Sequence, residues 1–355
     1  MNKLKYLLVG SGYRAEFYGR ISKTYPGLFK AMFLCRSEAK AASIQEKTGV
    51  DAVSSPEKGK QFHPDLIVVA VTKANIADVC AEWAEAGYPV LSETPAGTTP
   101  EQLLMLWKLH ETKNAKITVC EQYTRYPELT AGLNAVSRGR IGTPHSAFLS
   151  LAHDYHAFAL LRNMLDTAGE SYSVRGESFT TPIVETDSRY GPVTDGRISE
   201  KERAVLHIEY SSGKRAVYDF SGVQYHSFIR SRHLTVRGER GEWSDNTLLY
   251  LDDDGLPQKE CLRPVIPDRY SILDTPELQS FRAEWHPELR MENAQDEYAI
   301  ATMLYDMGEH LEGGPNPVPL KDALDDACFW LAARQAVNSP FETVHSLQMP
   351  WNNGG

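Results

Sequence analysis

The feature that most constrains the fold is a glycine-rich turn near the start of the chain. An apolar run of strand length, residues 4–9, leads directly into Gly10-Ser11-Gly12-Tyr13-Arg14-Ala15, and residues 16–25 have the composition of a helix. In a Gly-x-Gly-x-x-Ala segment the first glycine permits a tight turn, the second lets the backbone approach a pyrophosphate, and the small last residue keeps helix and strand close. The order of strand, turn and helix predicts a dinucleotide-binding site. The alternative is a glycine-rich turn in some other α/β protein.

The length and the net charge of the chain limit the classes of molecule that it can be expected to bind. The chain has 355 residues, 42% of them hydrophobic, which is enough to fill the cores of about two domains. Its net charge of −10 is spread along the sequence without a long block of like charges. This argues against nucleic acid and against an anionic membrane surface as partners. A small molecule is therefore the expected ligand.

The cysteines indicate a reducing compartment. There are five, an odd number, they lie far apart, and none belongs to a Cys-x-x-Cys pair, which argues for free thiols and against a bound metal. The apolar run at the N-terminus is too short for a signal peptide, and no stretch approaches the roughly 20 apolar residues of a membrane span. We expect a cytoplasmic protein.

Strand and helix signals alternate over the first third of the chain. Residues 65–71 form an uninterrupted apolar run, typical of a parallel strand buried on both faces, and shorter strands are expected at 31–35, 89–93 and 117–120. The alternation predicts a doubly wound parallel sheet, the Rossmann arrangement, in an N-terminal dinucleotide-binding domain of residues 1–122.

The remaining residues, 123–355, have the pattern of an α+β domain with a largely antiparallel, open sheet. Residues 204–210 and 214–220 alternate apolar and polar side chains on either side of Ser211-Ser212-Gly213, which predicts a hairpin. Residues 181–200, rich in Gly, Pro, Asp and Ser, are expected to form a long loop. Further strands are expected at 142–151, 234–236 and 247–251, and late helices at 300–311 and 320–335, which can pack back on the first domain.

The tip of the second strand bears on the choice of cofactor. An acidic residue there would bind the ribose 2′-hydroxyl of NAD, but the sequence is Cys35-Arg36-Ser37, and an arginine can instead receive the 2′-phosphate of NADP. NADP is therefore slightly favoured over NAD. The alternative is that Arg36 is a solvated loop residue.

Several of these segments resemble one family. The motif at residues 10–15, the strand at 65–71, the element Ala86-Gly87-Tyr88-Pro89-Val90-Leu91-Ser92-Glu93-Thr94-Pro95, and Arg140-Ile141-Gly142 before a histidine-bearing turn are similar to the Gfo/Idh/MocA oxidoreductases. The resemblance implies an N-terminal Rossmann domain and a C-terminal domain that binds substrate and pairs subunits through its sheet. It also implies a homodimer or homotetramer, and hydride transfer between a nicotinamide and a carbohydrate-like carbon.

The resemblance also assigns residues to the cofactor, and it has departures. Thr94 stands where the family has a lysine in Glu-Lys-Pro, and Ala152 stands where an aspartate usually precedes the catalytic histidine by four residues. Lys73 could supply the missing charge. The expected cofactor-binding residues are Gly10, Ser11, Gly12, Tyr13, Arg14, Arg36, Ser37, Thr72, Glu93, Thr94, Pro95 and Gln122.

His156 is the first choice for the acid or base, because imidazole titrates near neutrality and its position matches the family's histidine. His153, Asp154 and Tyr155 complete the expected catalytic group. If the preceding strand continues this far, His153 and Tyr155 share one face and Asp154 and His156 the other, so that Asp154 could orient His156. Tyr123 could reach the same pocket. The alternative is a capped helix start with a hydrogen-bonded histidine.

Three functions follow from these residues. The first is an NAD(P)-dependent oxidoreductase acting on a CH–OH group of a sugar, polyol or related compound, with His156 as acid or base. The second, suggested by Thr94, is a redox-neutral enzyme that cleaves a glycoside through transient oxidation. The third, suggested by both departures, is a dinucleotide sensor without catalysis. An arginine cluster at 230–240 could bind an acidic substrate, although a solvated strand face is the simpler interpretation.

Overall fold

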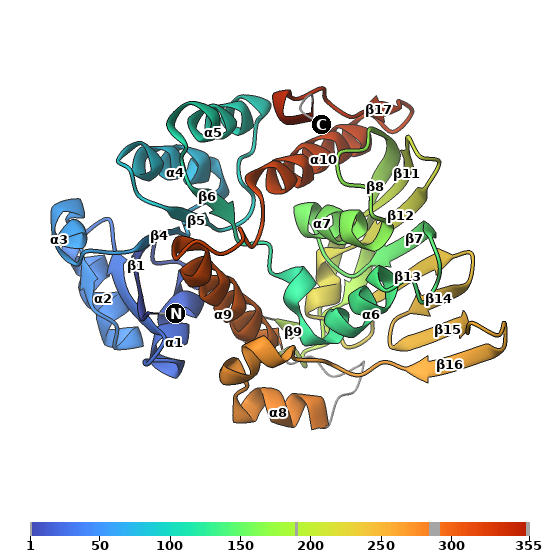
Figure 1. The fold of residues 1–355 in the computed structure, drawn as a ribbon, viewed down its shortest axis with the longest axis horizontal. Helices are drawn as coiled ribbons and strands as arrows, with labels where there is room; N and C mark the ends of the chain where they lie inside the picture. Colours follow the sequence, from blue (N-terminus) through green and yellow to red (C-terminus); the bar gives the residue numbers. More distant parts are fainter. Residues whose placement is uncertain (1, 189–190, 284–291, 353–355) are drawn as a thin grey trace.

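The N-terminal part of the chain forms a parallel sheet of six strands in the order β3-β2-β1-β4-β5-β6 (Figure 1). The computed structural model describes residues 2–188, 191–283 and 292–352. The doubly wound sheet expected from the alternation is thereby confirmed. Its strands are β1 Leu4–Val9, β2 Phe29–Leu34, β3 Ala52–Val53, β4 Leu66–Val69, β5 Val90–Ser92 and β6 Ile117–Val119.

Helices cover both faces of this sheet because neighbouring strand residues point in opposite directions. Tyr6 and Leu8 pack with α1, α2 and α9, whereas Leu7 packs with α4, α5 and α10. The strand order reverses between β1 and β4, and ligands of such sheets bind at the carboxyl ends of the strands beside this point. The connecting helices are α1 Tyr13–Thr24, α2 Glu38–Thr48, α3 Pro56–Gln61, α4 Ile76–Glu85 with the 3₁₀ turn Lys73–Asn75 before it, and α5 Pro100–Lys113.

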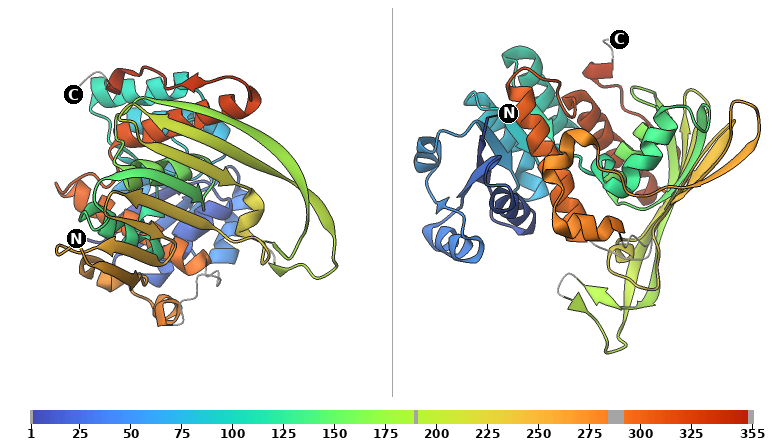
Figure 2. Two further views of the ribbon diagram at one scale, coloured as in Figure 1. Left: turned by 90° about the vertical axis from the view of Figure 1, so that its right-hand side faces the viewer. Right: turned by 60° about the horizontal axis from the view of Figure 1, so that its bottom comes forward.

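A second sheet of nine strands follows in the order β16-β15-β14-β13-β7-β12-β11-β8-β17. Only β12 and β7 pair in parallel among its described strands, so the expected antiparallel character is confirmed. Figure 2 shows that the helices of this part lie on one of its faces. The main strands are β7 Pro144–Ser150, β8 Tyr172–Val184, β11 Ile198–Tyr210, β12 Arg215–Phe220, β13 His233–Gly238, β14 Gly241–Ser244, β15 Thr247–Leu251, β16 Pro257–Cys261 and β17 Val344–His345.

The long loop expected at residues 181–200 is wrong at both ends, which belong to long strands, and two short strands, β9 Asp187–Ser188 and β10 Gly191–Pro192, lie between them. β8 continues to Val184 and β11 begins at Ile198, and these two residues pair at the end of a ladder that is 13 residues long on each side. Residues 189 and 190 lie outside the described part. The outer end of the hairpin extends past the helices (Figure 2), and residues 177–182 of β8 are all exposed there, so no apolar alternation marks them as strand. Glu185 stabilises it by accepting hydrogen bonds from Lys201 at 2.7 Å and Ser199 at 2.8 Å.

The late helices join the two sheets. Leu304 and Met307 of α9 pack in the core that contains Phe17 of α1. Helix α10 contributes Leu324 to the core of the first sheet and, further along, Phe329 to the core of the second. The helices of this part are α6 Pro127–Ser137, α7 Asp154–Leu165, α8 Pro276–Ala283, α9 Glu292–Leu311 and α10 Leu320–Asn338. No helix in the described ranges is long and apolar enough to cross a membrane.

Helix α6 lies close to the second sheet because Gly132 has no side chain. A Cβ at this position would come within 2.0 Å of the ring of Trp243, which is fully buried on β14. We expect Gly132→Ala to lower the free energy of unfolding by about 1–3 kcal/mol, the usual cost of overpacking a core, even after the gain in helix propensity. Urea unfolding measures this. Gly27→Ala, where a Cβ meets nothing within 4 Å, is the matched control and should change stability little.

Candidate active site

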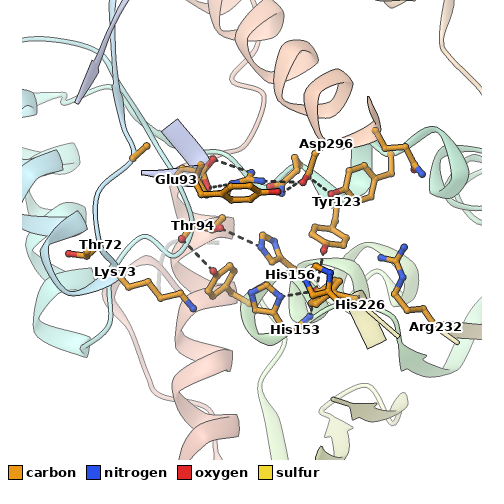
Figure 3. A pocket seen from close by; sticks show the side chains of 18 of the residues that line it. Thr72, Lys73, Glu93, Thr94, Tyr123, His153, His156, His226, Arg232 and Asp296 are labelled. Atoms are coloured by element: carbon orange, nitrogen blue, oxygen red, sulfur yellow. Dashed lines mark hydrogen bonds and ion pairs between the residues drawn. The ribbon is translucent and has the colours of Figure 1, made fainter. Parts of the chain in front are cut away.

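Two adjoining cavities lie at the carboxyl ends of the parallel strands. The first, here called the glycine-turn cavity, has a volume of about 790 Å³ and is lined by the turn at residues 10–14 and by Arg36 and Lys40. The second, the histidine cavity, has a volume of about 380 Å³ and is lined by His153, His156 and Thr94 among others (Figure 3). The two share five lining residues, which are Tyr13, Arg14, Ala70, Val71 and Thr72. A ligand with two ends can therefore occupy both.

Gly10 and Gly12 are required in the turn for different structural reasons. Gly10 has φ +129°, and a Cβ there would lie 2.2 Å from the carbonyl oxygen of Ala70 at the end of β4. A side chain at Gly10 would thus push β1 and β4 apart. A Cβ on Gly12 meets nothing within 4 Å, because it would project into open space beside the cavity. Gly12 is also the N-cap of α1, whose first N–H groups are available to an anion.

The tip of β2 is positively charged. Arg36 and Lys40 line the glycine-turn cavity together with Cys35. The Ser37 side chain accepts a hydrogen bond from the backbone N–H of Lys40 at 3.2 Å and thereby caps α2, while the residue itself lies outside the cavity lining. Of the expected cofactor residues, Pro95 also lies outside both linings and follows Thr94 across a cis peptide bond.

Arg14 and Glu93 bind each other at the junction of the two cavities. The Arg14 guanidinium donates to both carboxylate oxygens of Glu93, at 3.1 and 3.2 Å, and to Asp296 of α9 at 3.2 Å. The hydroxyl of Tyr18 donates to Glu93 at 2.7 Å. Gln122, another expected cofactor residue, lines the histidine cavity beside this group. Arg14 therefore connects α1, β5 and α9 as well as facing the cavity.

His156 lies deep in the histidine cavity and is bound to a carboxyl group that the sequence did not suggest. Its Nδ1 is 2.7 Å from Glu121 Oε2, and both side chains are 6% exposed. Its Nε2 lies 3.5 Å from the hydroxyl of Thr94. Burial lowers the pKa of His156 to about 3 and raises the pKa of Glu121 to about 8, because water no longer solvates either charge. The expectation that Asp154 orients His156 is wrong.

The strand expected to carry these residues ends earlier. β7 stops at Ser150, His153 is the N-cap of α7, and residues 154–156 are helical, so the expected alternation of faces is wrong. One turn of helix instead brings the rings of His153 and His156 within 5.1 Å. The chain leaves the extended conformation of β7 at the start of α7, where the backbone of Asp154 has φ +48°.

His153 has its own hydrogen-bond partner. The hydroxyl of Tyr225 lies 2.7 Å from Nδ1 of His153 and accepts hydrogen bonds from the His153 backbone N–H and the Tyr123 hydroxyl, at 2.9 and 3.1 Å. Because Tyr225 oxygen already accepts two hydrogen bonds, its own proton is directed to Nδ1, which leaves the His153 ring proton on Nε2. Burial lowers the pKa of His153 to about 3, so this imidazole is neutral near pH 7.

Lys73 reaches the histidine cavity from the turn after β4. Its Nζ lies 3.5 Å from Asp154 and 5.0 Å from the centre of the Tyr155 ring, and the Tyr155 hydroxyl donates to the Thr94 carbonyl at 3.4 Å. Figure 3 shows Lys73 and Arg232 on either side of the two histidines. Arg232 is the member of the 230–240 arginine cluster that lines this cavity.

Sequence reasoning missed Glu121, Tyr225 and Asp296. One signal was available for Glu121, since it directly follows β6, and polar residues at the carboxyl ends of parallel strands gather at the ligand crevice. Tyr225 and Asp296 come from distant segments whose local pattern contains no such signal. In the described ranges, no group of three His, Cys, Asp or Glu side chains is placed to hold a metal ion.

The order of the parallel strands and the glycine turn beside the cavity are those of a dinucleotide-binding fold. Residues 4–121 match the family described as an oxidoreductase family with an NAD-binding Rossmann fold. This confirms the resemblance to the Gfo/Idh/MocA oxidoreductases over residues 4–121. None of the curated proteins compared with the chain matches it in sequence.

Solved structures share the fold over nearly the whole chain. An NAD-binding oxidoreductase from Klebsiella pneumoniae is 13% identical with a TM-score of 0.71, and the match covers 98% of this chain and 100% of that one. Levoglucosan dehydrogenase with NADH and L-sorbose is 16% identical with a TM-score of 0.72 and the same coverage. The WlbA dehydrogenase from Chromobacterium violaceum, with NADH and UDP-GlcNAcA, is 16% identical with a TM-score of 0.66, covering 98% of this chain and 97% of that one.

The open space beside Gly12 gives a direct test of the glycine-turn cavity. Gly12→Val should fold normally, because an added Cβ meets no protein atom within 4 Å, but the branched side chain would stand where a pyrophosphate approaches the backbone. We expect nicotinamide dinucleotide binding to weaken at least tenfold, which is about 1.4 kcal/mol, with an unchanged melting temperature. Fluorescence titration with NADH and NADPH measures the binding. Wild-type affinity in the variant would contradict the assignment.

Proposed function

We propose that the protein is an NAD(P)-dependent dehydrogenase or reductase that acts on a CH–OH group of a carbohydrate-like substrate. The observation that carries the proposal is that His156, whose Nε2 lies 3.5 Å from the Thr94 hydroxyl, lines a cavity that adjoins the glycine-turn cavity. A nicotinamide bound there supplies or accepts the hydride. The sugar-bound dehydrogenases of the same fold support the carbohydrate class.

The chain's residues divide the work between the two cavities. The turn at Gly10, Ser11 and Gly12 and the start of α1 would hold the pyrophosphate. Thr72, Thr94 and Gln122 would border the nicotinamide end. We infer a preference for NADP, because Arg36 and Lys40 place two cations at the end of β2, where NAD-specific sites have an acidic residue.

The proton of the substrate hydroxyl would pass to or from His156. His156 is buried at the side of the cavity, so a substrate bound there can exchange a proton with it directly. Lys73 and Tyr155 would bind substrate oxygens at the side of the cavity near Thr94.

Assembly through the open face of the nine-stranded sheet stays a prediction, which sedimentation velocity of the purified chain tests.

Turnover of His156→Asn tests the function. Purified protein is assayed with NADP and NAD against a panel of sugars and polyols that includes levoglucosan and inositol, and nicotinamide reduction is followed by absorbance. We expect stoichiometric reduction in the wild type and a loss of kcat of about 100-fold or more in His156→Asn, the range for general acid–base residues. His63→Asn, an exposed histidine with φ +50°, is the control.

Two other results would overturn the proposal. Glycoside cleavage without net change in the nicotinamide would indicate the redox-neutral enzyme. Dinucleotide binding without turnover on the panel, unaffected by His156→Asn, would indicate a sensor.

The cofactor preference has its own test in Arg36→Asp. The substitution replaces a cation that would meet the 2′-phosphate by a carboxylate suited to a 2′-hydroxyl. We expect NADPH affinity to fall at least tenfold, about 1.4 kcal/mol, and the ratio of NADH to NADPH affinity to rise. Arg138→Asp, with the same change of charge on an exposed residue at the end of α6, is the control. An unchanged ratio would show that Arg36 is only a solvated residue.

A further inference from the structure

Glu121 is held rigidly beside His156 by the backbone around it. It follows β6, its own N–H donates to the carbonyl of Val119 at 2.9 Å, and its Oε1 accepts from the backbone N–H of Tyr123 at 3.1 Å. The other oxygen, Oε2, lies 2.7 Å from Nδ1 of His156. The carboxyl group thus has one oxygen fixed by the chain and one directed to the imidazole.

The opposite side of the imidazole is the side that faces the ligand. Nε2 lies near Thr94, and the ring packs against Tyr123 and Tyr155, with centroid distances of 4.6 and 4.5 Å. The two nitrogens of His156 therefore have separate surroundings, a buried carboxyl group on one side and the cavity on the other. In the described part of the chain, the further charged or titratable groups that act on His156 include Arg14, Glu93, Asp296, Asp154 and the adjacent His153, and those that act on Glu121 include Arg162 and Asp326.

We propose that Glu121 is the positioning residue that holds a proton on Nδ1 of His156, so that Nε2 is the atom that exchanges a proton with the substrate. The proposal rests on the proposed function. In the oxidation, the O–H bond of the substrate breaks and its proton forms an N–H bond at Nε2, while the C–H electron pair leaves with the hydride to the nicotinamide. The imidazolium that forms is neutralised by the Glu121 carboxylate. The reduction runs through the same atoms in reverse.

The protonation state of the Glu121–His156 pair also decides whether oxidation or reduction of the substrate is favoured at a given pH. Burial raises the pKa of Glu121 to about 8, and since the two groups share a hydrogen bond they take up this proton together. Above the midpoint the pair is an anion whose Nε2 has a free lone pair, which suits oxidation. Below it the pair is neutral and Nε2 can carry a proton, which suits reduction. His153 lacks such a carboxylate partner, because its Nδ1 faces Tyr225.

Glu121→Gln tests the proposal, with Glu128→Gln as the matched control, since Glu128 lines the same cavity from α6. Protein labelled with ¹⁵N-histidine is titrated by NMR with and without NADPH, and His156 is assigned by its loss in His156→Asn. In the wild type we expect the tautomer protonated on Nδ1 above the midpoint. In Glu121→Gln the protonation midpoint of His156 should fall by about one pH unit or more, because the stabilising carboxylate is gone.

Kinetics with the best substrate of the panel give the second measurement. We expect kcat of Glu121→Gln to fall about tenfold or more, with KM changed less than threefold and the pH step of oxidation lost. Glu121→Asp, which keeps the carboxylate, should retain the pH step, and it serves as the test should Glu121→Gln fail to fold. An unchanged His156 tautomer and pH profile, or equal effects of Glu121→Gln and Glu128→Gln, would overturn the proposal.

An incorrect function and an incorrect role for Glu121 would give different experimental results. Wild-type protein that binds neither NADH nor NADPH would contradict the proposed function. The NMR titration without cofactor would still report whether Glu121 sets the tautomer of His156. Normal binding and turnover with an unchanged His156 titration in Glu121→Gln would contradict the role of Glu121 alone.

Discussion

The placement of α7 against α10 is the constraint on which the site depends. Arg162 of α7 donates to both carboxylate oxygens of Asp326 on α10, each at 2.9 Å, and Phe158 stacks on Phe329 at a centroid distance of 4.4 Å. Because α10 also packs into the core of the parallel sheet, these contacts fix the start of α7 relative to β5 and β6. That position brings His156 to Glu121 and Thr94, which follow those two strands. A bidentate pair suits this role, since it fixes orientation as well as distance.

The carboxyl groups of the site have two kinds of partner. Those bound to Arg14 have a structural role, and the one bound to His156 is the reactive group. Arg14 forms ion pairs with both Glu93 and Asp296 at the junction of the cavities, and these contacts hold α1, α9 and the segment after β5 together. Among the residues that the structure describes, no arginine or lysine forms an ion pair with Glu121, which meets the weak base His156 instead. A buried carboxyl next to an imidazole can lose or gain a proton at modest cost, whereas one bound to arginine cannot. The reactive proton is therefore expected at the second pair.

Local signals in the sequence were enough for the parallel sheet and not for the details of the site. The turn at residues 10–15 encodes its strand, its helix and its open space within a dozen residues, and a buried run such as 65–71 has one reasonable conformation. The strand at residues 177–182 was missed because side chains that are exposed on both faces have no periodic pattern. Glu121 and His156 are 35 residues apart, and the orientation of α7 that joins them is set by packing against α10. No short motif contains that information.

Thr94 places a neutral side chain beside Nε2 of His156, on the side of the ring opposite Glu121. A lysine here would put its charge near Nε2 of His156, and a cation at that distance disfavours a second positive charge on the imidazole. With a neutral threonine at this position and a carboxylate behind the ring, the imidazole becomes the better proton acceptor. Lys73 leaves a cation in the cavity, yet it is drawn toward Asp154 and the Tyr155 ring. Thr94 at Nε2 and Glu121 at Nδ1 therefore act on the same imidazole from opposite sides, and both favour His156 as the proton acceptor.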